Sequence, residues 1–189
     1  MQVLGISGSL RLGSENTKLL RAAAELLPDD VDVELWNALK AIPPYDQDDD
    51  VEPAPAAVAA LRAAIAAADA VLFATPEYNS SLPGQLKNAI DWVSRPIAAN
   101  PLRNKPVAVI GASSGAFGAV WAQAELRKVL AATGARVVDG EVAVGHAPSK
   151  FDENGQLTDE ALREQLAEVM EALVAEVRPA PVAPATQAV

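Results

Sequence analysis

The sequence predicts a doubly wound α/β fold, in which a five-stranded parallel sheet lies between two layers of helices to give three αβα layers. Two observations support this prediction. Short apolar runs alternate with longer helical stretches along the 189 residues, and this alternation is typical of parallel strands joined by helices. Half of the residues are hydrophobic, many of them Ala, so helices can pack closely on a sheet. The length fits one domain, which we expect to span residues 1–178.

The first quarter of the chain predicts two strands and one helix. Residues 2–7 (QVLGIS) form an apolar run that indicates a buried strand. Residues 16–27 have leucines and alanines at helical spacing. Residues 31–36 (VDVELW) alternate apolar and polar side chains, which favours a half-exposed strand at the edge of the sheet. Residues 41–55 mix prolines with acids, so we expect an irregular connection there.

The middle of the chain repeats the pattern twice. Residues 56–68 are Ala-rich and predict a helix, and residues 69–75 (DAVLFAT) are almost entirely apolar, as a central parallel strand should be. A helix is expected from about residue 83 to residue 93, with Pro83 in its first turn, where the missing N–H costs nothing. Residues 105–112 (KPVAVIGA) then predict a fourth strand.

The last third predicts two helices and one strand. A helix over residues 117–133 is expected to end at Gly134, because glycine readily closes a helix. Residues 135–144 (ARVVDGEVAV) predict a fifth strand. We expect a final helix over residues 158–177 with Thr158 as its N-cap, followed by a disordered Pro/Ala-rich tail at 179–189.

Composition excludes several classes of function. The net charge is −10 and no Lys/Arg cluster opposes it, so neither a nucleic-acid surface nor an anchor on anionic membrane is expected. There is no cysteine and one histidine, His146, which removes thiolate chemistry and makes a Ser-His-Asp triad improbable. The acidic run at residues 46–50 fits a solvated loop better than a metal site. With no signal peptide and no membrane-length apolar run, a cytoplasmic protein is expected.

Polar residues follow the first predicted strand, in the segment GSLRLGSENT (residues 8–17). In a doubly wound sheet, ligands bind outside the carboxyl ends of the strands. Hydroxyls and an Arg beside a helix N-terminus suit a phosphate monoester. The alternative is that Ser14 or Asn16 caps the helix and Arg11 is solvated. The position after the first strand favours the phosphate, although the spacing matches neither a dinucleotide fingerprint nor a P-loop.

Two further loops follow the third and fourth predicted strands. In TPEYNSSLPG, Tyr78 offers an aromatic ring and Asn79 an amide, which fit a flat heterocycle as well as they fit an ordinary turn. In GASSGAFGA (residues 111–119), three glycines permit a close backbone approach and Ser113 and Ser114 can donate hydrogen bonds. Three such loops at successive strand ends indicate one site for a phosphate joined to a planar ring.

These segments resemble the NADPH-dependent FMN reductase family of flavodoxin-like flavoproteins, which includes quinone, chromate and azo-dye reductases. The resemblance spans about residues 1–150 and is carried by GSLRLGSEN, by TPEYNSSLPGQLKNAIDW, which is its most specific part, and by GASSGAFGAVWAQAELRKVL. It implies an enzyme in which NADPH or NADH reduces bound FMN and the FMN reduces a quinone-like or other small acceptor. No catalytic side chain and no metal are implied, because the flavin carries the chemistry.

The resemblance also implies roles for particular residues. The FMN phosphate would be held by Ser9, Arg11, Ser14 and Asn16. The isoalloxazine ring would be bordered, largely through backbone groups, by Pro76, Glu77, Tyr78 and Asn79, with Ser113 on the far side of the cofactor. The family forms homodimers or homotetramers with the flavin near the interface, and Asn88 and Trp92 would lie close to it.

Two positions depart from the family pattern. Ala119 and Trp121 stand where the family commonly has a Gly and a basic residue, so any contact made by that basic residue is in doubt. An alternative to the enzyme is a flavodoxin-type FMN electron carrier that does not oxidise nicotinamide. Flavodoxins usually carry a Ser/Thr-rich loop after the first strand, whereas GSLRLGSEN contains an Arg, which favours the reductase.

Overall fold

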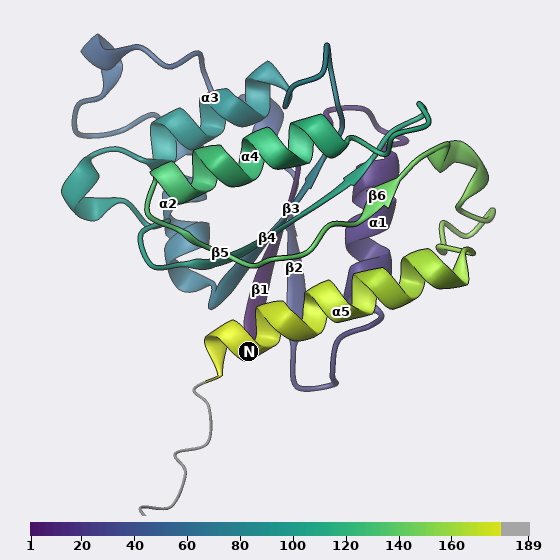
Figure 1. The fold of residues 1–189 in the computed structure, drawn as a ribbon. Helices are drawn as coiled ribbons and strands as arrows, with labels where there is room; N and C mark the ends of the chain where they lie inside the picture. The colour runs from purple at the N-terminus through teal and green to yellow at the C-terminus, as the bar shows by residue number, and fades with distance from the viewer. Residues whose placement is uncertain (179–189) are drawn as a thin grey trace, which may run out of the picture.

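The computed structural model describes residues 1–178, and the predicted tail at 179–189 lies outside the described residues. A twisted parallel sheet forms the centre of the molecule (Figure 1). Its strands follow the order β2-β1-β3-β4-β5, and β6 pairs with β4 beyond the end of β5. The strand bounds are β1 Gln2–Ser7, β2 Asp32–Trp36, β3 Ala70–Thr75, β4 Pro106–Ala112, β5 Arg136–Val137 and β6 Ala143–Val144.

The predicted fifth strand at 135–144 is wrong as a continuous element. It is split into β5 and β6, which both run parallel to β4. Gly140, at φ +139°, lies between the two pieces in a backbone conformation that is essentially restricted to glycine. The chain therefore leaves the ladder after Val138, whose N–H still donates to Val107 O, and returns at Val142, whose carbonyl accepts from Gly111 N.

Helices cover both faces of the sheet (Figure 1). Helices α1 and α5 pack on one face with β-strand side chains such as Val3 and Leu72, and α2, α3 and α4 pack on the other with Leu4 and Phe73. The alternation along each strand follows from the two-residue period of strand side chains. The helix bounds are α1 Glu15–Ala24, α2 Ala56–Ala67, α3 Gly84–Val93, α4 Val120–Ala132 and α5 Glu160–Val177.

The last helix begins later than expected. Asp159 is its N-cap, and the Asp159 side chain accepts a hydrogen bond from Leu162 N at 3.2 Å. The prediction that Thr158 caps the helix is therefore wrong. The Thr158 hydroxyl instead donates to Lys150 O at 3.2 Å. Both residue types cap helices well, and only the tertiary contact with Lys150 decides between them.

The irregular connection at 41–55 is fastened to α3. The Asn88 side chain accepts from Tyr45 N at 2.7 Å and donates to Pro43 O at 2.8 Å, and the Trp92 indole also donates to Pro43 O, at 2.9 Å. Trp92 is fully buried. The polar groups that the resemblance places near a subunit interface thus bond within the chain. Among residues 1–178, no helix combines the length and apolar character that crossing a bilayer requires.

Candidate functional site

A cavity of about 320 Å³ opens at the carboxyl ends of β1, β3 and β4. Parallel strands bring the loops that follow them to the same edge of the sheet, so this cavity unites the three segments singled out from the sequence. The predicted site residues that line it are Ser9, Arg11, Asn16, Pro76, Glu77, Tyr78 and Ser113. Ser14 and Asn79 belong to the same loops but do not line the cavity.

Ser14 is the N-cap of α1. It is 3% exposed, and its hydroxyl accepts from Thr17 N at 3.2 Å. The next two N–H groups, at Glu15 and Asn16, have no backbone acceptor among residues 1–178. Unsatisfied N–H groups and the helix dipole give this end of α1 a partial positive charge. The start of α1 can therefore bind an anion even though the Ser14 hydroxyl itself is occupied as a cap.

Asn16 joins two loops of the site. Its side-chain Nδ2 donates to Ala112 O and its Oδ1 accepts from Ala112 N, both at 2.9 Å, across 96 positions in sequence. The residue is 3% exposed. Both ends of the amide are thus committed to the end of β4. Asn16 fixes the distance between the phosphate-suited turn and the Gly/Ser loop, which is a structural role that the sequence did not suggest.

Arg11 is the cation of the cavity. Its side chain is 64% exposed and forms a 3.3 Å ion pair with Glu15, and Glu15 also pairs with Lys18 at 3.0 Å. The Glu15 side chain is only 13% exposed and keeps Lys18 as a second partner, whereas water screens the exposed Arg11 end of the pair. The Arg11 guanidinium can therefore turn to a phosphate with little loss, because a charge-assisted bond to phosphate is the stronger interaction.

The loop after β3 contains a tight turn. Tyr78 N donates to Ser81 O at 3.0 Å and Ser81 N donates to Tyr78 O at 3.2 Å, with Asn79 at φ +53° and Ser80 at φ +58° between them. Two central residues at positive φ define a type I′ turn, which favours Asn. Asn79 is therefore a turn residue. Because the Tyr78 N–H is bonded inside the turn, it is not free to meet the edge of a heterocycle.

Glu77 connects this loop to α4. Its Oε2 accepts hydrogen bonds from Trp121 N and Ala122 N, both at 3.1 Å. Ala119 is the residue before α4 and lies at φ +64°, and its methyl side chain cannot cap the helix. Glu77 thus serves as a cap supplied from another loop. The sequence predicted a start at residue 117, whereas α4 begins at Val120, so this cap could not be recognised from the sequence.

The glycines of the third loop differ in importance. A Cβ on Gly118, which lies at φ +59°, would be 2.3 Å from the backbone carbon of Ala143. A Cβ on Gly115 would meet nothing closer than the Ser113 hydroxyl at 3.6 Å. Gly118 therefore lets the loop close against β6, whereas Gly115 is not required for packing.

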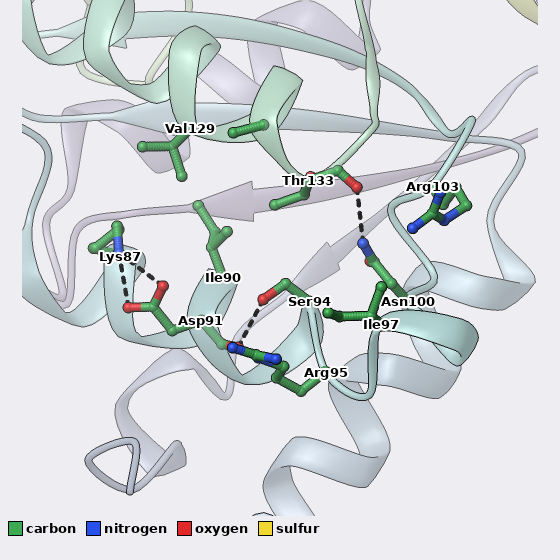
Figure 2. A pocket seen from close by; sticks show the side chains of 11 residues that line it. Lys87, Ile90, Asp91, Ser94, Arg95, Ile97, Asn100, Arg103, Val129 and Thr133 are labelled. Atoms are coloured by element: carbon green, nitrogen blue, oxygen red, sulfur yellow. Dashed lines mark hydrogen bonds and ion pairs between the residues drawn. The ribbon is translucent and has the colours of Figure 1, made fainter. Parts of the chain in front are cut away.

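A separate cavity of about 420 Å³ lies between the C-terminal ends of α3 and α4, at the other edge of the sheet (Figure 2). Some of its polar groups are paired with one another. Lys87 and Asp91 form an ion pair at 2.7 Å, and Asn100 Nδ2 donates to Thr133 O at 2.8 Å. Arg95 and Arg103 also line this cavity, and within residues 1–178 neither has a carboxylate at ion-pair distance. Within residues 1–178, no cluster of three or more His, Asp or Glu is arranged to hold a metal.

Comparisons with known proteins agree with this geometry. Residues 1–149 match the family model of NADPH-dependent FMN reductases. The chain is 45% identical over 174 residues to an NAD(P)H-dependent FMN reductase of Pseudomonas aeruginosa, covering 92% of this chain and 93% of that one. It is 38% identical over 179 residues to a 2-hydroxy-1,4-benzoquinone reductase of Burkholderia, covering 94% and 97%.

A solved structure is similar over nearly the whole length. The flavoenzyme NAD(P)H:(acceptor) oxidoreductase of Paracoccus denitrificans has a TM-score of 0.82 and 35% identity, covering 93% of this chain and 96% of that one. The flavodoxin-like, three-layer architecture predicted from the sequence is confirmed by this neighbour and by the sheet order.

Proposed function

Because this chain belongs to the NADPH-dependent FMN reductase family, we propose that it is an FMN-dependent oxidoreductase that uses NAD(P)H to reduce quinone-like small molecules. The relatives named as FMN and quinone reductases support both the cofactor and the class of acceptor. The observation that carries the proposal is the cavity formed jointly by the loops after β1, β3 and β4. Bound FMN would supply the two-electron chemistry, by accepting a hydride from the nicotinamide and passing electrons to the acceptor.

The residues of the cavity fit FMN. The phosphate would lie at the start of α1, where the N–H groups of Glu15 and Asn16 are without a backbone acceptor among residues 1–178 and Arg11 can reach it. Ser9 also lines this end of the cavity. A phosphate monoester offers enough acceptor oxygens to satisfy these donors together.

The ring of FMN would lie between the loops after β3 and β4. Pro76 is buried and stiffens the exit from β3, and Tyr78 presents a side chain that is 54% exposed. Ser113 lines the same cavity from the loop after β4. Since Tyr78 N–H is bonded to Ser81 O, the N–H groups of Asn79 and Ser80, which have no backbone acceptor among residues 1–178, are the donors of this turn that remain for the ring edge. The Glu77 side chain would hold this loop in place through its hydrogen bonds to the start of α4.

Exposed aromatic side chains beside the cavity support a homodimer or homotetramer. Phe117 is 64% exposed and Trp121 48%, and their rings meet edge to face with centroids 5.0 Å apart. Large exposed apolar patches mark interaction surfaces. Trp121 would contribute apolar contact area in place of the basic residue common in the family. A cytoplasmic location is also part of this proposal.

One experiment tests the proposed function. Purified protein is mixed with FMN, freed of excess cofactor and titrated anaerobically with NADPH or NADH while the flavin absorbance is recorded. We expect stoichiometric FMN, bleaching by reduced nicotinamide and recovery of the absorbance on addition of a benzoquinone. Protein that binds FMN but is not bleached by either nucleotide would be an electron carrier, and protein that retains no FMN would overturn the proposal.

A further inference from the structure

A second cavity, of about 520 Å³, lies on the other side of the loop after β1. It is bounded by that loop, by α1 and by the short turn η1 (Leu39–Ala41) that follows β2. Ser9 and Arg11 line both this cavity and the FMN cavity. The two spaces are therefore adjacent, and a long ligand that begins in one can end in the other.

The second cavity is cationic in an acidic protein. In the part of the chain that the structure describes, it is lined by Arg11, Arg21 and Lys40 and by no carboxylate, although the chain has 25 Asp and Glu against 15 Lys and Arg. By contrast, the FMN cavity contains Glu15 and Glu77. Within residues 1–178, neither Arg21 nor Lys40 has a carboxylate at ion-pair distance. Two unpaired cations facing one cavity favour an anionic ligand.

The same cavity also offers apolar and aromatic surface. Leu12 is fully exposed and Leu10 is 46% exposed, and both line the cavity together with Trp36. An aromatic ring and apolar side chains provide contact area for the face of a flat base. Apolar surface beside unpaired cations therefore fits a nucleotide, which joins a flat base to phosphate.

We propose that this cavity binds the adenosine 2′-phosphate end of NADPH, with Arg21 and Lys40 holding the 2′-phosphate and Trp36 contacting the adenine or its ribose. The inference rests on the proposed function, because it requires the nicotinamide end to reach the FMN cavity past Ser9 and Arg11. NADH lacks the 2′-phosphate, so this site makes the enzyme prefer NADPH. A neutral quinone would gain nothing from two unpaired cations, which argues against the cavity being the acceptor site.

Direct binding tests this site independently of turnover. The FMN-loaded protein is titrated calorimetrically with adenosine 2′,5′-bisphosphate and, separately, with adenosine 5′-monophosphate. We expect the bisphosphate to bind about tenfold or more tightly than the monophosphate, and this advantage to fall about tenfold in Arg21→Gln/Lys40→Gln, since charge-assisted bonds to phosphate are lost. The matched control is Arg103→Gln/Lys128→Gln, which removes the same charge from exposed positions outside both cavities and should retain the wild-type advantage.

Kinetics separates this inference from the proposed function. In the Arg21/Lys40 variant we expect KM for NADPH to rise about tenfold, while KM for NADH and both kcat values stay within about twofold of wild type. Each single variant is measured as well, so that a folding defect in the double variant does not decide the result. Equal affinity for the two adenosine phosphates, or a parallel rise in both KM values, would overturn the 2′-phosphate site. The enzyme would still be an FMN reductase if it bound FMN and oxidised NADH.

Discussion

Glu77 and Trp121 lie 44 positions apart in sequence, yet Glu77 Oε2 accepts the Trp121 backbone N–H at 3.1 Å and thereby caps α4 from the loop after β3. An acidic side chain at a helix N-terminus satisfies an orphan donor and favours the dipole. Since Pro76 and Tyr78 flank Glu77, the same contact fixes the loop that would border the flavin ring. We therefore expect the stability of α4 and the affinity for the cofactor to be coupled through this one carboxylate.

The Glu77→Ala variant should lose about 1 kcal/mol of unfolding free energy, the usual effect of deleting an N-cap. Urea denaturation of the FMN-free protein measures this loss. FMN affinity should fall as well, because the loop is no longer tied to α4. Glu77→Gln keeps an acceptor oxygen, so its unfolding free energy and its FMN affinity should lie between those of wild type and Glu77→Ala. Glu164→Ala, at an exposed position of α5, is the control, and a Glu77→Ala protein as stable as that control would contradict the capping role.

The Asn16→Ala variant should be destabilised even without cofactor. Removing the amide leaves both the Ala112 N–H and the Ala112 C=O unsatisfied in a buried position, which we expect to cost about 2–3 kcal/mol. Urea denaturation of the FMN-free protein measures this loss of unfolding free energy. The control is Ser114→Ala, at an exposed position in the loop after β4. Unchanged stability with lost FMN affinity would show instead that Asn16 is a direct phosphate ligand.

Gly118→Ala should be far more damaging than Gly115→Ala. At Gly118 the added methyl would lie 2.3 Å from the Ala143 backbone at a positive φ, so the loop must move and about 3 kcal/mol or more should be lost. At Gly115 the nearest atom is a hydroxyl 3.6 Å away, and the effect should be small. Thermal melts of the two variants side by side test this difference, and equal melting temperatures would contradict it.

Acid should weaken the start of α5 through Asp159. The hydrogen bond from Lys150, followed by that from the Leu162 N–H, lowers the pKa of the Asp159 carboxyl below its ordinary value. A carboxyl whose pKa is lower when folded stabilises the protein above its unfolded pKa, about 4, and loses that contribution as pH falls through the folded pKa.

Melting temperature should therefore fall below about pH 4 more steeply in wild type than in Asp159→Asn, which cannot titrate. The control is Asp32→Asn, at an exposed position of β2 outside the ion pairs of the described chain. Identical dependence of melting temperature on pH in wild type and Asp159→Asn would show that Asp159 does not contribute to the loss of stability in acid.

Trp121 should stabilise the association of two copies of this chain. If the exposed Phe117–Trp121 pair lies at a subunit contact, Trp121→Gln should weaken the dimer about tenfold or more, because buried Trp side chains dominate interface energies. Analytical ultracentrifugation over a dilution series measures the dissociation constant. Val51→Gln alters another exposed apolar residue, which is 61% exposed in the 41–55 connection, and should leave assembly unchanged. Equal dissociation constants for the two variants would contradict the assignment.

Periodicity predicted most of the fold because it reports burial directly. Residues 70–75 are buried at every position, which is why an unbroken apolar run identified β3 as a central strand. The boundaries were harder to predict. The break between β5 and β6 depends on one glycine conformation, and the choice of Asp159 over Thr158 as a cap depends on a contact with Lys150.

The site was predicted as a group of loops but not in its internal contacts. The strand ends of a parallel sheet must meet at one edge, so Ser9, Pro76 and Ser113 could be placed together from their order in the sequence alone. The hydrogen bonds of Asn16 and Glu77 could not be predicted this way. Their partners lie 96 and 44 positions away, and no local pattern specifies pairs at that distance.

The sequence by itself determined the layered α/β architecture, the three loops of the candidate site and the resemblance to FMN reductases, because local periodicity and short motifs encode them. Only the tertiary structure decided how the polar side chains are used. Ser14 and Glu77 cap helices, Asn16 joins α1 to β4, and Asn79 forms a turn. It also brought Arg21 and Lys40, from different elements, to one cavity. Such roles depend on which partners folding places within hydrogen-bond or ion-pair distance, and that is a property of the packed molecule.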